Sequence, residues 1–143
     1  MILPDVNVLV HAHNADSAMH ARARQWWREC LSGSEGIGLA WVALLGFIRL
    51  TTSRRIVARP LHIQEVMAIV ASWLDLPHVH LALPSDGHFA QLRAELERLG
   101  TAGNLTTDAH LAVLAMERGY ILYSTDADFA RFPGLRWVNP CEG

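Results

Sequence analysis

Along the chain, short continuous runs of hydrophobic residues alternate with longer segments in which hydrophobic residues recur at helical spacing. Short apolar runs are typical of buried strands, and they occur at residues 1–4, 36–40, 78–83, 120–124 and 135–138. Apolar residues spaced by three and four predict helices, here over residues 6–12, 18–31, 41–50, 63–74, 85–99 and 106–118. Short strands that alternate with longer helices predict an α/β domain with a mostly parallel central sheet flanked by helices. No linker or repeat interrupts the pattern, so we expect one domain over residues 1–143.

Particular residues mark the expected helix ends. Gly33, Gly100 and Gly119 each follow an apolar stripe and are expected to end a helix. Ser85 is expected to cap the helix whose apolar stripe begins at Phe89. These positions divide the chain into the elements of an α/β fold.

Acidic residues stand where strands of the predicted sheet end. Asp5 follows the first strand, Asp126 and Asp128 follow the strand at 120–124, and Asp108 lies near the start of an apolar helix. Parallel sheets bind ligands beyond the carboxyl ends of their strands, so these carboxylates are expected to converge. Clustered carboxylates repel one another unless a divalent cation lies between them, and hard oxygen ligands favour Mg²⁺ or Mn²⁺ over zinc. The pattern therefore indicates metal-assisted phosphodiester hydrolysis.

Each of these acids also has a purely structural interpretation. Asp5 and Asp108 could cap helices, and Asp126 and Asp128 could be turn residues. The residues alone leave both interpretations open. Their joint position at one predicted sheet edge favours a site.

Composition excludes several classes of protein. With 51% hydrophobic residues and a net charge of −2, the chain is neither disordered nor uniformly basic. All twelve basic residues are arginine, which argues against haloacid-dehalogenase phosphatases, response-regulator receivers and P-loop NTPases, because each needs a lysine. The longest apolar stretch, Ile37–Ile48, is too short to span a bilayer, and the N-terminus lacks the basic residues of a signal peptide. We therefore expect a cytoplasmic protein that does not contact membranes, with Cys30 and Cys141 as reduced thiols.

Arginines and tryptophans suggest further sites. Arg54, Arg55 and Arg59 lie in the predicted loop at 53–61 and could clamp RNA phosphates, although the sequence favours a solvated loop. The five tryptophans lie mostly on apolar stripes, so we expect them in the core or in a protein-binding groove rather than stacked on bases.

Two His-x-His pairs, at residues 11/13 and 78/80, raise the question of a metal site of a different kind. His78 and His80 would share one face of a strand, but no third ligand accompanies them, so zinc is not assigned. His110 lies two residues after Asp108, about 200° around the helix, and is expected to lie outside the acidic ligand set.

Three segments resemble the acidic motifs of the PIN domain: MILPDVNVLV, TDAHLAVLA and YSTDADFARFPGLRW. Within this family the chain most resembles the VapC toxins, over essentially its whole length. The most specific matches are Asp-x-Asn at 5–7, Thr-Asp-Ala at 107–109 and Thr-Asp-x-Asp-Phe at 125–129. The resemblance implies a Mg²⁺-dependent endoribonuclease, with Mn²⁺ as a possible substitute, which attacks RNA with an activated water. It also implies a cognate VapB-like antitoxin as inhibitor, and a homodimer.

The same resemblance implies roles for individual residues. Asp5 and Asp108 would be metal ligands, Asp126 would complete the catalytic acids, and Asp128 would assist as a further ligand. Around these carboxylates, hydrogen bonds are expected from Asn7 and Thr125.

The chain departs from the PIN pattern at one position. PIN domains usually carry a Glu in the helix after the second strand, where this chain has Gly46, and no Asp or Glu occurs between Glu35 and Glu65. We therefore expect one tightly held ion rather than two. The alternative is a degenerate PIN domain that binds RNA or a partner without cleaving. The retained acids argue for catalysis, because clustered carboxylates are costly.

Overall fold

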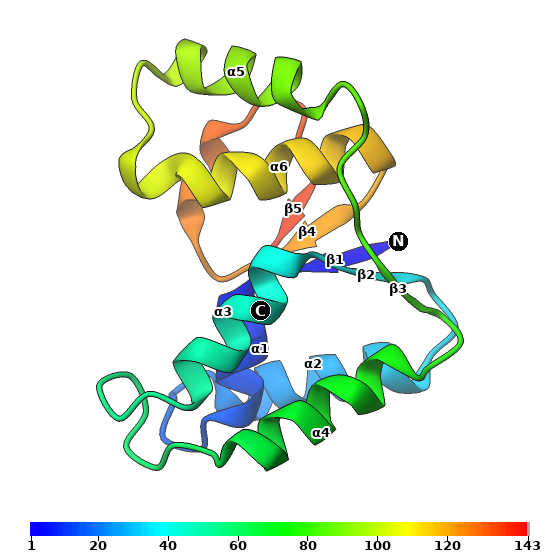
Figure 1. Cartoon of the computed structure of the whole chain (residues 1–143), viewed down its shortest axis with the longest axis vertical. Coiled ribbons are helices and arrows are strands. Elements are labelled where there is room, and N and C mark those ends of the chain that lie inside the picture. Colours follow the sequence, from blue (N-terminus) through cyan, green and yellow to red (C-terminus); the bar gives the residue numbers. More distant parts are fainter. Residues whose placement is uncertain (143) are drawn as a thin grey trace.

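The structure is a computed structural model that describes residues 1–142. A five-stranded sheet runs through the middle of the molecule (Figure 1). Its strand order is β3-β2-β1-β4-β5, and every neighbouring pair is parallel. The strands are β1 (Ile2–Pro4), β2 (Ile37–Leu39), β3 (Val79–Leu81), β4 (Ile121–Tyr123) and β5 (Trp137–Val138). The prediction of an α/β fold with a largely parallel sheet is confirmed.

Six α-helices flank the sheet. They are α1 (Val6–His13), α2 (His20–Ser32), α3 (Trp41–Thr51), α4 (Ile63–Leu74), α5 (His88–Leu99) and α6 (Thr106–Arg118), with short 3-10 turns η1 (Gly103–Leu105) and η2 (Ala127–Arg131). Helices α1 to α4 lie on one side of the sheet, and α5 and α6 lie on the other (Figure 1). All six predicted helices are present, and α2 begins two residues later than expected. Across residues 1–142, no helix combines the length and hydropathy needed to cross a bilayer.

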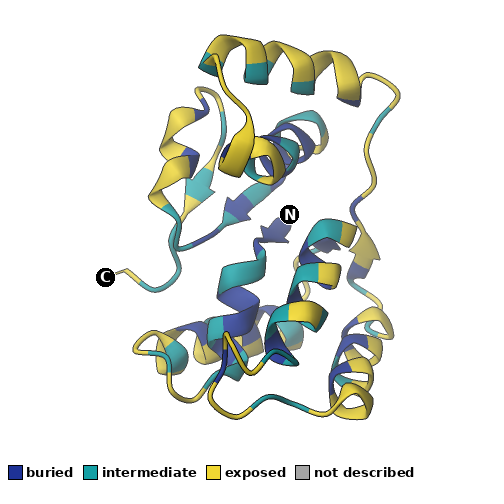
Figure 2. Cartoon of the chain, turned by 60° about the vertical axis from the view of Figure 1, so that its left-hand side comes forward, coloured by how far each residue is buried: buried dark blue, intermediate teal, exposed yellow. Residues whose placement is uncertain are grey.

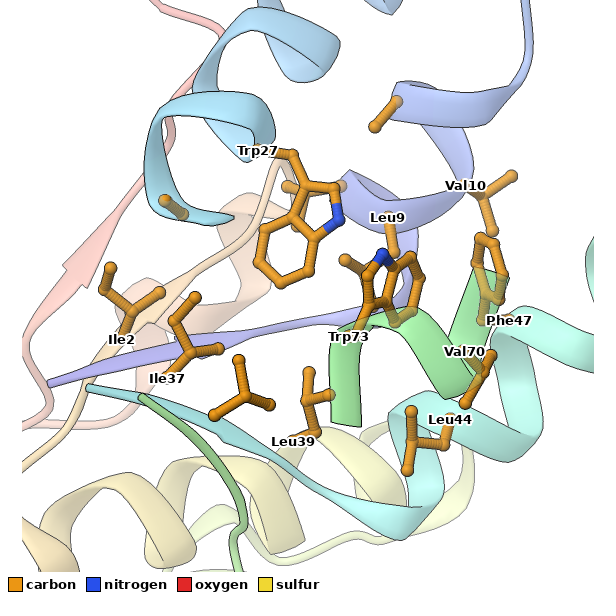
Figure 3. Packing of buried hydrophobic residues seen from close by; sticks show 14 of the residues in the cluster. Ile2, Leu9, Val10, Trp27, Ile37, Leu39, Leu44, Phe47, Val70 and Trp73 are labelled. Atoms are coloured by element: carbon orange, nitrogen blue, oxygen red, sulfur yellow. The ribbon is translucent and has the colours of Figure 1, made fainter. Parts of the chain in front are cut away.

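Alternate residues of the central strand pack into different cores, because successive side chains of a strand point to opposite faces. Ile2 joins the cluster that contains Trp27 and Trp73 from α2 and α4 (Figure 3). Leu3 joins the other cluster, with Leu122 from β4 and residues of α6. Strands β1 and β2 are buried throughout, which explains why they read as continuous apolar runs in the sequence.

The start of α5 differs from the prediction. The helix begins at His88, after Gly87, and Ser85 does not cap it. Instead the Ser85 hydroxyl donates to Glu117 Oε2 at 2.6 Å, and its backbone amide donates to Glu117 Oε1 at 3.0 Å. Phe89, expected to begin the buried stripe, is 71% exposed. The spacing of apolar residues therefore predicted the helix correctly, but the cap at Ser85 and the burial of Phe89 were predicted wrongly.

A buried polar network joins α5 to α6. The Glu117 side chain is 3% exposed and also accepts a hydrogen bond from His88 Nδ1 at 3.0 Å. On its other side, His88 Nε2 lies 2.8 Å from His110 Nδ1. Burial alone would raise the pKa of Glu117, but the hydrogen bonds from Ser85 and His88 outweigh it and lower that pKa. The network stabilises the position of α6, which carries Asp108.

We expect Glu117→Gln to lower the free energy of unfolding at neutral pH by about 1–3 kcal/mol, because an amide cannot accept from all three donors. Since the pKa of Glu117 is lower in the folded protein than its ordinary value of 4.5, the stabilisation by its charge exists above that value and is lost as pH falls through the folded one. Urea unfolding near pH 7 and near pH 4 should show the deficit shrinking in acid. The control is Glu97→Gln at an exposed pair with Arg93, where we expect a change below about 0.5 kcal/mol. An equal deficit at both pH values would contradict the prediction.

Candidate functional site

The carboxyl ends of β1 and β4 meet where the strand order reverses, the position at which open parallel sheets bind ligands. The register pairs Pro4 with Tyr123, and the Asp5 amide donates to the Tyr123 carbonyl at 2.9 Å. The next residues along the two strands, Asp5 and Ser124, therefore lie side by side. Sequence positions more than a hundred residues apart meet here.

Asp5 is buried, with 6% of its surface accessible to solvent. Its Oδ1 accepts from the Val6 amide at 2.7 Å, so Asp5 caps α1, and its Oδ2 accepts from the Ser124 hydroxyl at 2.8 Å. Burial raises the pKa of Asp5, and these two hydrogen bonds offset part of that effect. The capping interpretation is thus correct, and it leaves the carboxylate in position to face the site.

Ser124 connects the acids and was not identified from the sequence. It is fully buried, and its hydroxyl oxygen accepts from Asn7 Nδ2 at 3.1 Å and from the Asp126 amide at 3.0 Å while it donates to Asp5. One hydroxyl thereby orients residues from β1, α1 and the end of β4. The available signal was a small polar residue at the end of an apolar strand, directly before the acidic Thr-Asp-x-Asp segment.

The two expected hydrogen-bonding residues behave differently. Asn7 has the expected place, since it contacts Ser124 and its Oδ1 accepts from the Thr125 amide at 3.3 Å. Thr125 takes part through this backbone amide, so its hydrogen bond reaches Asn7 beside the carboxylates rather than a carboxylate itself. The chain turns sharply after Ser124, and this turn presents the Thr125 amide rather than its side chain.

Three further carboxylates lie together beside Asp5. Asp108, Asp126 and Asp128 each offer an oxygen within 4.8 Å of the others. Asp126 caps η2, and its Oδ1 accepts from the Asp128 amide at 2.9 Å, which confirms its turn role. Asp128 is exposed and lies 3.6 Å from the Arg131 guanidinium.

Asp108 lies in the first turn of α6 and does not cap it, because the helix begins at Thr106 after Leu105. Burial, followed by the charges of Asp5, Asp126 and Asp128, raises the pKa of Asp108 to about 6. Both effects disfavour a negative charge on Asp108 at this position.

A cavity of about 180 Å³ opens above these side chains. Asp5, Asp108 and Asp126 all line it, whereas Asp128 stands outside the lining. The remaining lining residues are Val6, Asn7, Val42, Ala43, Thr107 and Leu111. The structure therefore brings together the three acids predicted to be catalytic.

The residues present fit a hard divalent cation. Carboxylate oxygens are the ligands that Mg²⁺ prefers, and this ion keeps several of its waters. A cavity of about 180 Å³ has room for an ion with such waters, since one water occupies about 30 Å³. A cation would also offset the two effects that raise the pKa of Asp108, which are burial first and then the charges of the neighbouring carboxylates.

Close packing of α3 on α1 explains the missing acid at Gly46. A Cβ atom added there would lie 2.9 Å from Val6 Cγ2 and 3.4 Å from Val6 Cβ. Any side chain at this position would displace Val6, whose amide donates to the Asp5 carboxylate. Helix α3 accordingly contributes only Val42 and Ala43 to the cavity lining.

The arginines and histidines of interest lie outside this cavity. Arg54, Arg55 and Arg59 follow the end of α3 that lies away from the cavity, and Arg59 pairs with Asp16 at 3.2 Å. His110 contacts His88 rather than the acids, as predicted.

His78 and His80 have separate partners. His78 Nε2 lies 3.1 Å from the Cys30 carbonyl, and His80 Nε2 lies 2.6 Å from the Tyr120 hydroxyl. The two rings therefore serve different contacts and do not form the beginnings of a zinc site.

Comparison with known proteins gives consistent results. The PIN domain family matches residues 2–135. Ribonuclease VapC33 of Mycobacterium tuberculosis is 41% identical over 140 residues, which cover 98% of each chain. The crystal structure of M. tuberculosis VapC20, a toxin described as cleaving the sarcin-ricin loop, superposes with a TM-score of 0.69 at 20% identity, over 95% of this chain and 99% of that one. VapBC2 of Rickettsia felis, bound to a DNA fragment from its promoter, gives a TM-score of 0.65 at 20% identity, over 97% and 98% of the two chains.

We expect Gly46→Ala to lower the free energy of unfolding by about 1–3 kcal/mol, because the added methyl group would overlap Val6. Alanine is the better helix former by about 1 kcal/mol, so the sign of the change is informative. Urea unfolding measures it. Gly87→Ala is the matched control, since its nearest contact would be the Ser85 hydroxyl at 4.0 Å. A Gly46→Ala protein more stable than wild type would show that α3 does not approach α1 this closely.

Proposed function

Because the chain belongs to the PIN domain family and, within it, to the VapC ribonucleases, we propose that its acidic cavity hydrolyses RNA phosphodiester bonds with a bound Mg²⁺. Mn²⁺ is the expected substitute. The observation that supports this most strongly is that Asp5, Asp108 and Asp126 line one cavity at the carboxyl ends of β1 and β4. We assign the catalytic role to these three residues.

Each acid contributes from a different element. Asp5, Asp108 and Asp126 would hold the ion, with Asp128 within reach as a further ligand. A bound divalent cation supplies charge neutralisation at the scissile phosphate and lowers the pKa of an attacking water.

The surrounding residues keep the carboxylates oriented. The Ser124 hydroxyl donates to the Asp5 carboxylate and accepts from the backbone amide of Asp126. The Asn7 side chain donates to the same hydroxyl and orients it. The apolar wall formed by Val42, Ala43 and Leu111 limits the access of bulk water to one side of the cavity. Attack by water on phosphorus would leave a 5′-phosphate and a 3′-hydroxyl.

We further propose a cognate VapB-like antitoxin as the protein partner, a homodimeric toxin and a cytoplasmic place of action. Support comes from the family and from neighbours such as VapBC2, which was solved as a complex with promoter DNA. An antitoxin side chain or helix that enters the acidic cavity would block it, and an arginine would suit its charge.

The rival function is a PIN domain that binds RNA or a partner without cleaving it, and Gly46 is the observation in its favour. The clustering of Asp5, Asp108 and Asp126 around one cavity argues against it, because like charges gathered in this way are expensive to keep at a site that binds no cation.

Cleavage assays separate the two functions. With structured RNA and Mg²⁺, we expect wild-type protein to cleave and both Asp5→Asn and Asp108→Asn to lose at least about 100-fold in rate, since each removes a charged ligand that the bound ion needs. EDTA should abolish cleavage. The control is Asp75→Asn, an exposed carboxylate at the end of α4. Cleavage that persists in EDTA, or products with 2′,3′-cyclic phosphate ends, would contradict the proposed chemistry.

We expect titration calorimetry with Mg²⁺ to show one strong site per chain, because the α3 side of the cavity offers no carboxylate. Asp108→Asn should remove it. Two strong sites in the wild-type protein would show that other oxygens complete a second site.

A further inference from the structure

The acidic cavity has few side chains that can donate a hydrogen bond. Of its nine lining residues, three are carboxylates, which only accept hydrogen bonds when ionised, and four are apolar. The other two are Asn7 and Thr107. The Asn7 side chain is engaged at both ends, since its Nδ2 donates to the Ser124 hydroxyl and its Oδ1 accepts from the Thr125 amide. Within residues 1–142, Thr107 is therefore the one lining side chain whose donor has no hydrogen-bond partner.

The hydroxyl of Thr107 differs from those of the other helical threonines. A threonine in a helix commonly donates to a backbone carbonyl three or four residues earlier. Thr51, Thr52 and Thr106 all do so, at 2.7, 2.8 and 2.8 Å respectively. Thr107 makes no such contact within the part of the chain that the structure describes, so its hydroxyl is free to rotate toward a ligand.

Thr107 lies where a ligand can reach it. It belongs to the first turn of α6, directly before Asp108. Residues 111–115 of the same helix are buried, whereas its first two residues are exposed (Figure 2). Thr107 is thus accessible to a molecule that enters the cavity which this residue helps to line.

A phosphodiester bound in this cavity needs a hydrogen-bond donor. Its non-bridging oxygens are negatively charged and only accept hydrogen bonds, so neither the carboxylates nor the apolar wall can hold them. A bound cation would neutralise their charge, whereas a hydrogen bond adds the direction on which in-line attack depends. Arg131, a further donor near the acids, pairs with Asp128, which stands outside the lining.

We propose that the Thr107 hydroxyl donates a hydrogen bond to a non-bridging oxygen of the scissile phosphate and thereby orients it beside the three acids. This inference rests on the proposed function, because it takes the acidic cavity as the place of cleavage. It assigns to the cavity a substrate contact that is separate from the carboxylates expected to hold the ion.

Binding of a product analogue tests the inference without cleavage. Adenosine 5′-monophosphate carries the 5′-phosphate that the proposed reaction leaves, and it has no phosphodiester bond. Calorimetry with this nucleotide and Mg²⁺ measures its Kd for the full-length protein. We expect Thr107→Val, which keeps the branched shape and loses the hydroxyl, to weaken binding by at least about 10-fold, as for a lost hydrogen bond to a charged group. Thr107→Ser should retain the affinity, and both variants should bind Mg²⁺ alone as tightly as the wild-type protein.

The matched control is Thr106→Val at the neighbouring position. The Thr106 hydroxyl donates to the Gly103 carbonyl, and Thr106 does not line the cavity. This variant should keep the nucleotide affinity and unfold at a lower urea concentration. RNA cleavage supplies a second measurement, in which Thr107→Val should be at least about 10-fold slower and Thr107→Ser close to wild type.

Wild-type nucleotide affinity in Thr107→Val would overturn the inference. So would weaker binding of Mg²⁺ alone by this variant, because the hydroxyl would then act on the ligands of the ion rather than on the phosphate. Nucleotide binding that depends on Thr107, in a protein that cleaves no RNA, would instead refute the proposed function and leave the phosphate contact standing.

Discussion

The hydrogen bond from Ser124 to Asp5 joins the two strand ends on which the site is built. A carboxylate with 6% exposure is tolerable only if its oxygens are satisfied, and here one accepts from Ser124 and the other from the amide that begins α1. The same hydroxyl accepts from the Asp126 amide. A single buried contact between β1 and β4 therefore positions a helix, a strand end and two of the three catalytic acids assigned to this site.

The approach of α3 to α1 decides which side of the cavity carries charge. Gly46 allows the two helices to touch at Val6, so the α3 wall is apolar and the acids come from β1, α6 and the turn after β4. Negative charge is thus concentrated on one wall, and the outer face of α3 is free of acids.

Structural and chemical roles coexist in the same side chains. Asp5 caps α1 and Asp126 caps η2, yet both line the cavity, because a carboxylate has two oxygens with several acceptor positions. The sequence alone could not decide whether Asp5 and Asp126 cap helices or line a site. In the structure each residue does both. For Asp108 the cap was excluded, since α6 begins two residues earlier.

Hydrophobic period and the placement of acids after strands were enough to predict all six helices, the parallel sheet and the convergence of Asp5, Asp108 and Asp126, because these depend on local pattern and on how parallel strands end. Contacts between distant segments were beyond such patterns. The engagement of Ser85 by Glu117, the exposure of Phe89 and Trp41, and the linking role of Ser124 depend on which neighbour each element meets. The spacing of apolar residues specifies that one face of a helix is apolar. Only packing in three dimensions determines how much of that face is covered and which polar atoms form hydrogen bonds.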